Sequence, residues 1–199
     1  LLRKQSGGCE KHATRDPCQI EKFTGARFRF LAASTFDEAG HTLFPATELR
    51  SFGKGRQRVT IGFVGLTLRG TPLLVAPDGV EGLRFADEAE TINAAIPRLR
   101  AAGADAVVVL IHEGIYTSGT ANPDGCEAAS GALLPILERL DSGVDVVVSG
   151  HTHWSYVCDW RSADGARSVL LTSAGVYGQL VTEIALQIDP AANRVVSRT

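Results

Sequence analysis

Several features that would assign this protein to a class are missing from its 199 residues. No apolar run approaches the roughly 20 residues that a membrane-spanning helix needs, so the sequence predicts no transmembrane helix. An excess of one charge is also missing. The formal net charge is −2, which gives no reason to expect a nucleic-acid polymer or an anionic membrane as partner. The P-loop and Gly-x-Gly-x-x-Gly motifs do not occur, so nucleotide binding through such a phosphate cradle is not supported.

Methionine does not occur at all, and the chain opens on Leu1. We therefore expect the sequence to be a piece of a longer product whose targeting signals would lie upstream. Apolar residues make up 44% of the chain and charged residues 21%, which is ordinary for a globular protein. The length suffices for one domain with a substantial core, and no linker-like segment divides it.

Cysteine is scarce, with four residues and no Cys-x-x-Cys motif. Cys9 and Cys18 bracket a polar loop, while Cys126 and Cys158 follow two of the strands predicted below. Two disulfides, Cys9–Cys18 and Cys126–Cys158, would each tie down a loop and would imply an oxidising compartment. Four free thiols are an alternative. A zinc site that combines Cys158 with His153 is a third interpretation.

Three apolar runs indicate strands that are buried on both faces: Val59–Leu66, Asp105–Ile111 and Val144–Ser149. A helix capped by Asp87 is predicted between the first two runs, and a second helix that ends near Gly143 is predicted between the last two. Two strand–helix–strand crossovers in a row predict parallel neighbouring strands with helices outside. The expected fold class is therefore α/β.

Other segments give weaker patterns. Arg27–Ala33 is β-prone and predicts a strand. Val169–Ser173 and Leu180–Ile188 have no helix between them and predict neighbouring antiparallel strands, with Arg194–Ser197 as a candidate third. The basic stretch Arg50–Arg58 is punctuated by glycines and is interpreted as a solvated turn.

The histidines are the most informative residues. A Gly-His-Thr-His sequence directly follows the third apolar run and contains His151 and His153, and His112 directly follows the second run. Parallel strands deliver their ends to one edge of a sheet, where open α/β folds place their chemistry. Because imidazole suits zinc, manganese, iron and related ions, the three residues predict part of a metal site. His12 and His41 lie in polar loop sequence and are assigned no role.

Carboxylates to complete that site are lacking. Three neutral imidazoles could hold one zinc ion with an open position, but a two-metal centre also needs carboxylate ligands. Glu113 would point to the opposite side of the extended chain, and Asp105 and Asp145 begin their strands at the far end of the sheet. Either the missing ligands come from outside these residues, or the centre is not dinuclear. Ser173 lacks a Gly-x-Ser-x-Gly elbow, so a small-residue turn is expected there rather than a nucleophile.

The ordered motifs resemble the calcineurin-like metallophosphoesterases, specifically the bacterial 5′-nucleotidase / 2′,3′-cyclic-nucleotide phosphodiesterase branch. The resemblance rests on Ile61–Leu66, Gly103–His112, Asp145–His153 and Ser173–Gly178, and covers about residues 23–188. It implies part of an αββα two-sheet sandwich, with mixed sheets and flanking helices, that holds two divalent metal ions (Zn, Mn, Fe or Co). By resemblance, His112 and His151 bind one ion and His153 binds the other.

The family's Asp-x-His, Gly-Asp and Gly-Asn-His-[Asp/Glu] motifs do not occur here. The resemblance therefore implies that residues 1–199 are the second half of a catalytic domain. The catalytic residues are then expected upstream of Leu1, and the nucleotide-binding C-terminal domain also lies outside. Whether this part is active alone is left open.

We interpret the protein as a periplasmic or secreted hydrolase of nucleotide catabolism that acts on a nucleotide or a related phosphoester. Metal-activated water would attack the phosphorus atom. The missing half of the same enzyme and a second copy of the chain are the candidate partners. Two alternatives are a related dinuclear hydrolase of another ester, similar to thiohydrolases, and a non-catalytic binding module on the same scaffold.

Overall fold

The computed structural model describes residues 6–9, 14, 18–118 and 125–199. The chain divides into two compact units, Leu1–Phe30 and Leu31–Thr199. In the first unit, a disulfide joins Cys9 to Cys18, and the Gly8 N–H donates a hydrogen bond of 2.8 Å to the Phe23 carbonyl. The strands and helices discussed below belong to the second unit.

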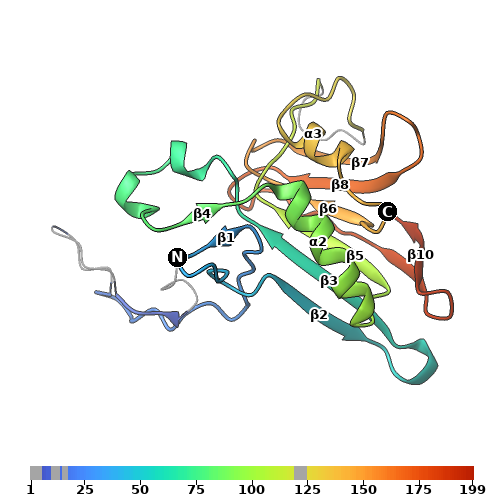
Figure 1. Ribbon diagram of the computed structural model, residues 1–199, viewed down its shortest axis with the longest axis horizontal. Helices are drawn as coiled ribbons and strands as arrows, with labels where there is room; N and C mark the ends of the chain where they lie inside the picture. The colour runs from blue at the N-terminus through green and yellow to red at the C-terminus, as the bar shows by residue number, and fades with distance from the viewer. Residues whose placement is uncertain (1–5, 10–13, 15–17, 119–124) are drawn as a thin grey trace. The chain divides into compact units, whose positions relative to one another are not determined.

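A six-stranded mixed sheet in the order β2-β3-β5-β6-β8-β7 forms the centre of the second unit (Figure 1). Its strands are β2 (Thr47–Phe52), β3 (Val59–Leu66), β5 (Ala106–Ile111), β6 (Val146–Val148), β7 (Ser155–Arg161) and β8 (Ser168–Ala174). The four inner strands are parallel, and the strand at each edge is antiparallel to its neighbour. The α/β fold class predicted from the sequence is therefore confirmed.

Shorter elements surround this sheet. Two further two-stranded sheets pair β1 (Thr35–Phe36) with β4 (Arg84–Phe85) and β9 (Leu186–Asp189) with β10 (Arg194–Arg198). Three short 3-10 helices are η1 (Gly55–Gln57), η2 (Thr71–Leu73) and η3 (Pro77–Gly79).

Two α-helices cover one face of the central sheet. α2 (Glu88–Ala101) connects β3 to β5, and α3 (Leu133–Glu138) lies between β5 and β6. The Asp87 side chain caps α2 by accepting a hydrogen bond from the Glu90 N–H, as the sequence predicts. The apolar side chains on this face are buried with those of the helices in one cluster that includes Ile92, Ile96, Leu99, Val64, Val107, Val109, Val147 and Leu171.

The opposite face of the sheet carries a second apolar cluster, because successive side chains of a strand point to opposite faces. Val108, Val146 and Leu170 are buried there, and they pack with partly buried neighbours that include Leu186. Leu110, on the same face of β5, remains 37% exposed. The apolar side chains on this face are therefore buried less completely than those on the face under the helices.

Two aspartates fix the end of the sheet that is remote from the histidines. Asp105 accepts a hydrogen bond of 2.6 Å from the Thr60 N–H, and Asp145 accepts one of 2.8 Å from the Val107 N–H. Each carboxylate thus ties the start of its own strand to the preceding parallel strand. Both residues lie at the amino end of the sheet, as predicted, and leave the carboxyl edge to the histidines.

Several predictions about elements are wrong. The first three residues of the basic stretch Arg50–Arg58, which was expected to be a solvated turn, belong to β2. Arg27–Ala33 forms no strand, because no neighbouring strand pairs with it. Within Leu180–Ile188 only the last residues enter a strand, and that strand pairs with β10 instead of β8. The antiparallel neighbour of β8 is β7. The alternating Tyr156, Cys158 and Trp160 are typical of such a half-buried strand.

Candidate metal centre at the carboxyl edge of the sheet

His112 and His151 lie side by side where two parallel strands end. His112 follows β5, and its N–H donates a hydrogen bond of 3.2 Å to the carbonyl of Leu66 at the end of β3. The ring centroids of the two histidines are 5.2 Å apart. Two imidazoles bound to one tetrahedral ion, with metal–nitrogen distances of about 2.0–2.1 Å, would have centroids about 5 Å apart. The observed separation therefore fits two ligands of a single divalent ion.

The electrostatics favour the neutral, ligating form of His112. Partial desolvation lowers the pKa of His112, and the nearby His151 and His153 lower it further, because a second positive charge beside them is unfavourable. A histidine must be neutral to bind a metal ion. The lowered pKa of His112 is therefore compatible with binding of a cation by this residue.

The turn that carries His151 and His153 has an unusual backbone. Both residues adopt left-handed conformations, with φ of 66° and 61°. For a residue with a side chain such a conformation costs of the order of 1–3 kcal/mol, and such residues cluster at functional sites. The His153 ring packs against the Tyr177 ring, with ring centroids 5.7 Å apart.

The loops after β5 and β6 are held against each other by backbone contacts. The Gly150 N–H donates to the Glu113 carbonyl over 3.0 Å, and the Thr152 hydroxyl donates to the Ile115 carbonyl over 2.9 Å. A Cβ atom on Gly114 would lie 2.2 Å from the Gly150 carbonyl oxygen. Only glycine fits at that point, and this close approach sets the position of the two histidine-bearing segments.

A buried tyrosine forms hydrogen bonds with residues near both loops. The Tyr156 hydroxyl accepts a hydrogen bond of 3.2 Å from the Ile115 N–H, and its oxygen lies 2.6 Å from the Ser149 hydroxyl oxygen. Since Ser149 donates its own proton to the Thr172 carbonyl, Tyr156 must be the donor toward Ser149. Burial raises the pKa of Tyr156. Sequence reasoning does not identify this residue, because a tyrosine in a strand resembles any core aromatic.

Carboxylates do not complete the site within this chain. Glu113 is buried, and its side chain accepts a hydrogen bond of 2.9 Å from the Gly114 N–H instead of pointing with His112 to solvent. In the described residues, no group of three or more His, Cys, Asp or Glu side chains is arranged to hold a metal ion. The structure thus supplies a pair of imidazoles, and the role of His153 as a ligand stays a prediction.

Ser173 lies within β8, so the turn expected from the sequence at this residue is wrong. Ser173 is buried, and its hydroxyl donates a hydrogen bond of 2.7 Å to the Trp154 carbonyl. Of the two histidines given no role, His41 is exposed and lies 3.7 Å from Asp37, while His12 falls outside the described residues.

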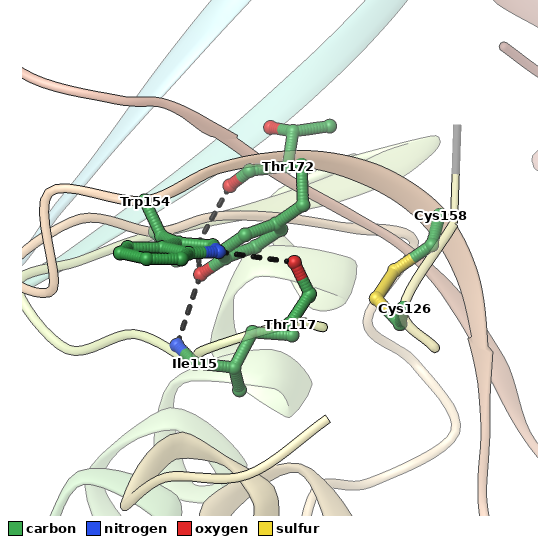
Figure 2. Close-up of a disulfide and its surroundings, with 8 residues drawn as sticks. Ile115, Thr117, Cys126, Trp154, Cys158 and Thr172 are labelled. Atoms are coloured by element: carbon green, nitrogen blue, oxygen red, sulfur yellow. Dashed lines mark hydrogen bonds between the residues drawn. A yellow bond between two sulfur atoms is a disulfide. The ribbon is translucent and has the colours of Figure 1, made fainter. Parts of the chain in front are cut away.

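The second disulfide of the chain joins Cys126 to Cys158 close to these loops (Figure 2). The structure therefore forms both disulfides considered from the sequence, and the alternatives of four free thiols and of a zinc site with Cys158 are wrong. Cys158 lies within β7 and not in a loop. The disulfide links this edge strand to the segment that follows β5.

No protein-family model matches the chain, but individual proteins and solved structures resemble it. Endonuclease YhcR of Bacillus subtilis is 23% identical over 201 residues, which cover 100% of this chain and 14% of that protein. The structure of sulfate thiohydrolase SoxB from Thermus thermophilus superposes with a TM-score of 0.66 at 23% identity, over 87% of this chain and 27% of that one. A 5′-nucleotidase precursor, also from Thermus thermophilus, gives a TM-score of 0.65 at 21% identity, over 87% and 33%.

These likenesses confirm the resemblance predicted from the sequence at the level of fold. The chain has the α/β fold of the calcineurin-like phosphoesterases of the 5′-nucleotidase type. It spans 14% of the length of the endonuclease, and 27% and 33% of the two solved chains. Among the described residues, no helix is long and apolar enough to cross a membrane.

Proposed function

We propose that this chain supplies metal-ligating histidines to a divalent-metal-dependent phosphoesterase that hydrolyses nucleotides. The reaction would be that of a 5′-nucleotidase or a 2′,3′-cyclic-nucleotide phosphodiesterase. The observation that carries the proposal is the pairing of His112 and His151, whose rings lie 5.2 Å apart at the carboxyl edge of the sheet. The shared fold with a 5′-nucleotidase precursor supports the same reaction class.

The residues of the chain would hold and orient the centre. His112 and His151 would ligate one ion as neutral imidazoles, and His153 is assigned to the second ion. Bound divalent ions would activate water and stabilise the charge that develops on the phosphoryl oxygens. The hydrogen bonds of Tyr156 and the close contact at Gly114 would keep both loops in place during the reaction.

The carboxylate ligands are proposed to come from polypeptide outside these 199 residues. Two divalent ions carry about four positive charges, which neutral imidazoles do not offset. The buried Glu113 and the remote Asp105 and Asp145 are each engaged in backbone hydrogen bonds. The chain is accordingly proposed to be one part of a catalytic domain.

We propose that the rest of the catalytic domain packs against the face of the sheet that the helices do not cover. Leu110 is 37% exposed there, in the middle of a sheet whose other face is buried under two helices. Isolated chain is expected to bind an apolar dye or to self-associate, because apolar patches of this kind favour association. A monomeric gel-filtration profile without dye binding would contradict this contact.

An oxidising compartment is part of the proposal. Two disulfides are present, and disulfides form and persist in secreted, extracellular and periplasmic proteins. We therefore propose a periplasmic or secreted location.

The direct test is hydrolysis by the longest natural polypeptide that contains these residues. Phosphate release from nucleoside monophosphates and opening of 2′,3′-cyclic nucleotides would be measured with Mn²⁺ or Zn²⁺ and after chelation. Activity is expected to require the added ion and to fall about 100-fold or more in His151→Ala, because loss of even a group that supports a metal ligand costs roughly 10–100-fold. His41→Ala, which alters an exposed histidine with no assigned role, is the matched control and should retain activity.

Three results would overturn the proposal. The first is nucleotide hydrolysis that survives both chelation and His151→Ala. The second is metal-dependent turnover of thioesters or sulfate esters without any turnover of nucleotides, which would favour the thiohydrolase-like alternative. The third is ligand binding without any turnover, which would favour the binding module.

A further inference from the structure

Tyr177 combines an exposed ring with an unfavourable backbone. The residue is 86% exposed, and its φ of 59° is left-handed. An exposed side chain contributes little to the apolar core, so burial of the ring does not offset the cost of this backbone conformation. Residues held in such conformations cluster at functional sites. Tyr177 is therefore a candidate for a role outside the packing of the fold.

Tyr177 lies in the turn that follows β8, at the same edge of the sheet as the histidines. β8 pairs in parallel with β6, and the chain that leaves β6 carries His151 and His153. We call residues 175–178 the tyrosine turn. Gly175 and Gly178 in this turn also have left-handed backbones, with φ of 73° and 69°. Glycine adopts such a conformation readily, whereas tyrosine does not.

The tyrosine turn packs against the turn that carries His153. The antiparallel pairing of β7 with β8 brings the two turns together. The Ser173 hydroxyl donates a hydrogen bond of 2.7 Å to the Trp154 carbonyl. A Cβ atom on Gly175 would lie 3.9 Å from the His153 carbonyl oxygen. The backbones of the two turns are therefore in contact.

The rings of His153 and Tyr177 meet where these turns touch. Their centroids are 5.7 Å apart, and their planes are inclined at 57°. This separation lies within the usual range for interacting aromatic rings. His153 is itself exposed, so packing within the core does not fix its imidazole. The Tyr177 ring covers one side of this imidazole and restricts its orientation.

We propose that Tyr177 is a positioning residue that orients the His153 imidazole for metal binding. This inference rests on the proposed function, which assigns His153 to the second ion, and it adds a residue that the proposed function does not include. A ligand that already has its binding orientation loses less conformational entropy when it binds. Removal of a group that orients a metal-bound histidine typically lowers metal affinity about 10-fold to 100-fold.

The test is metal binding by the longest natural polypeptide that contains these residues. Bound Zn²⁺ per chain would be measured by elemental analysis after equilibration with buffers of graded free Zn²⁺. The natural protein is expected to bind two ions. In Tyr177→Ala the affinity for one ion should fall about 10-fold to 100-fold, while the affinity for the ion at His112 and His151 should not change. Tyr177→Phe keeps the ring and should bind both ions as the natural protein does.

Tyr177→Gly separates the role of the ring from that of the backbone. Because glycine relieves the left-handed conformation, its equilibrium constant for unfolding should be about 5-fold lower than that of Tyr177→Ala. Its affinity for the second ion should nevertheless be as low as in Tyr177→Ala, since both variants lack the ring. A merely structural role predicts the opposite, namely that metal affinity follows stability and recovers in Tyr177→Gly.

Phe52→Ala is the matched control. It removes an aromatic residue that is 51% exposed and lies at the opposite end of the sheet, where it pairs with Val59 at the start of β3. This variant should bind both ions as tightly as the natural protein.

The inference is overturned by any of four results. These are unchanged binding of both ions in Tyr177→Ala, recovered affinity in Tyr177→Gly, a loss in Tyr177→Phe as large as in Tyr177→Ala, and binding of a single ion by the natural protein. Nucleotide hydrolysis that still requires a divalent ion would leave the proposed function standing in each of these cases. Hydrolysis that needs no metal ion, by a natural protein that binds none, would contradict the proposed function as well.

Discussion

At the scale of single residues, His151 combines a functional side chain with an unfavourable backbone. Its φ of 66° is left-handed, which disfavours any residue with a Cβ atom. We therefore expect His151→Gly to be more stable than His151→Ala by about 1 kcal/mol, because glycine relieves the strain and alanine does not. Both variants remove the imidazole and should lose metal binding equally. Urea unfolding measures the difference.

His41 provides the comparison, since it is an exposed histidine outside the set of residues with positive φ. His41→Gly should therefore be no more stable than His41→Ala. If His151→Ala proved as stable as His151→Gly, the left-handed backbone at this position would not be strained. The backbone conformation would then no longer indicate a functional site.

The sequence allows part of the site to be predicted at this scale. His112 and His151 could be placed together, because each directly follows a buried parallel strand and such strands end at one edge. Tyr156 and Gly114 could not be identified. The role of Tyr156 depends on Ser149 and Ile115 from other segments, and that of Gly114 on a contact with Gly150. Such roles arise from tertiary contacts that a sequence pattern does not contain.

At the scale of elements, Asp87 joins the start of α2 to the end of α3. Its side chain caps α2 and forms ion pairs with Arg139 at 2.6 Å and with Arg69 at 3.2 Å. The hydrogen bonds from Arg139 lower the pKa of Asp87 below its ordinary 3.8. The charged carboxylate therefore stabilises the fold above the unfolded-state pKa, and this contribution is lost as the pH falls through the lower folded-state pKa.

Asp87→Asn is expected to keep the cap and to remove the charge, because asparagine and aspartate cap helices about equally well. At pH 7 the free energy of unfolding should fall by about 1–2 kcal/mol, which is below the roughly 1.5–3 kcal/mol of buried hydrogen bonds to charged groups because both arginines are partly exposed to solvent. The difference between the two proteins should narrow below about pH 4. Asp78→Asn, at an exposed acid, is the control and should show no such pH dependence. A difference that stays constant down to pH 2 would contradict the assigned ion pairs.

Elements buried on both faces were the most predictable. β3 has the predicted bounds, and the strands before His112 and His151 and both helices are present. Helical structure continues past Pro97 to Ala101, although a proline inside a helix removes one backbone hydrogen bond. The packing of Ile96 and Leu99 against the sheet holds the last turn in place. The edge strands β2 and β7 have no continuous apolar sequence, because polar residues interrupt both of them.

At the scale of the whole molecule, the Cys126–Cys158 disulfide should contribute most among the covalent constraints. It closes a loop with a sequence separation of 32, against 9 for Cys9–Cys18. In the chain-entropy description, a loop of this length stabilises the folded state by about 3–4 kcal/mol. Replacing Cys126 and Cys158 with serine should lower the free energy of unfolding by roughly that amount, as measured in urea. The same replacement of Cys9 and Cys18 should have a smaller effect, and the reverse order would contradict this account.

His112 and His151 are proposed to bind one divalent ion together, and the whole proposed function depends on this. The most direct measurement is a Zn²⁺ titration of the 199-residue chain followed through the imidazole C–H resonances in NMR spectra. The resonances of His112 and His151 are expected to shift together and to saturate with one ion, at Zn²⁺ concentrations that leave the resonances of the exposed His41 unchanged. In His151→Ala the shift of His112 should disappear. The claim would be contradicted if His112 and His151 responded independently, or only at Zn²⁺ concentrations that shift His41 as well.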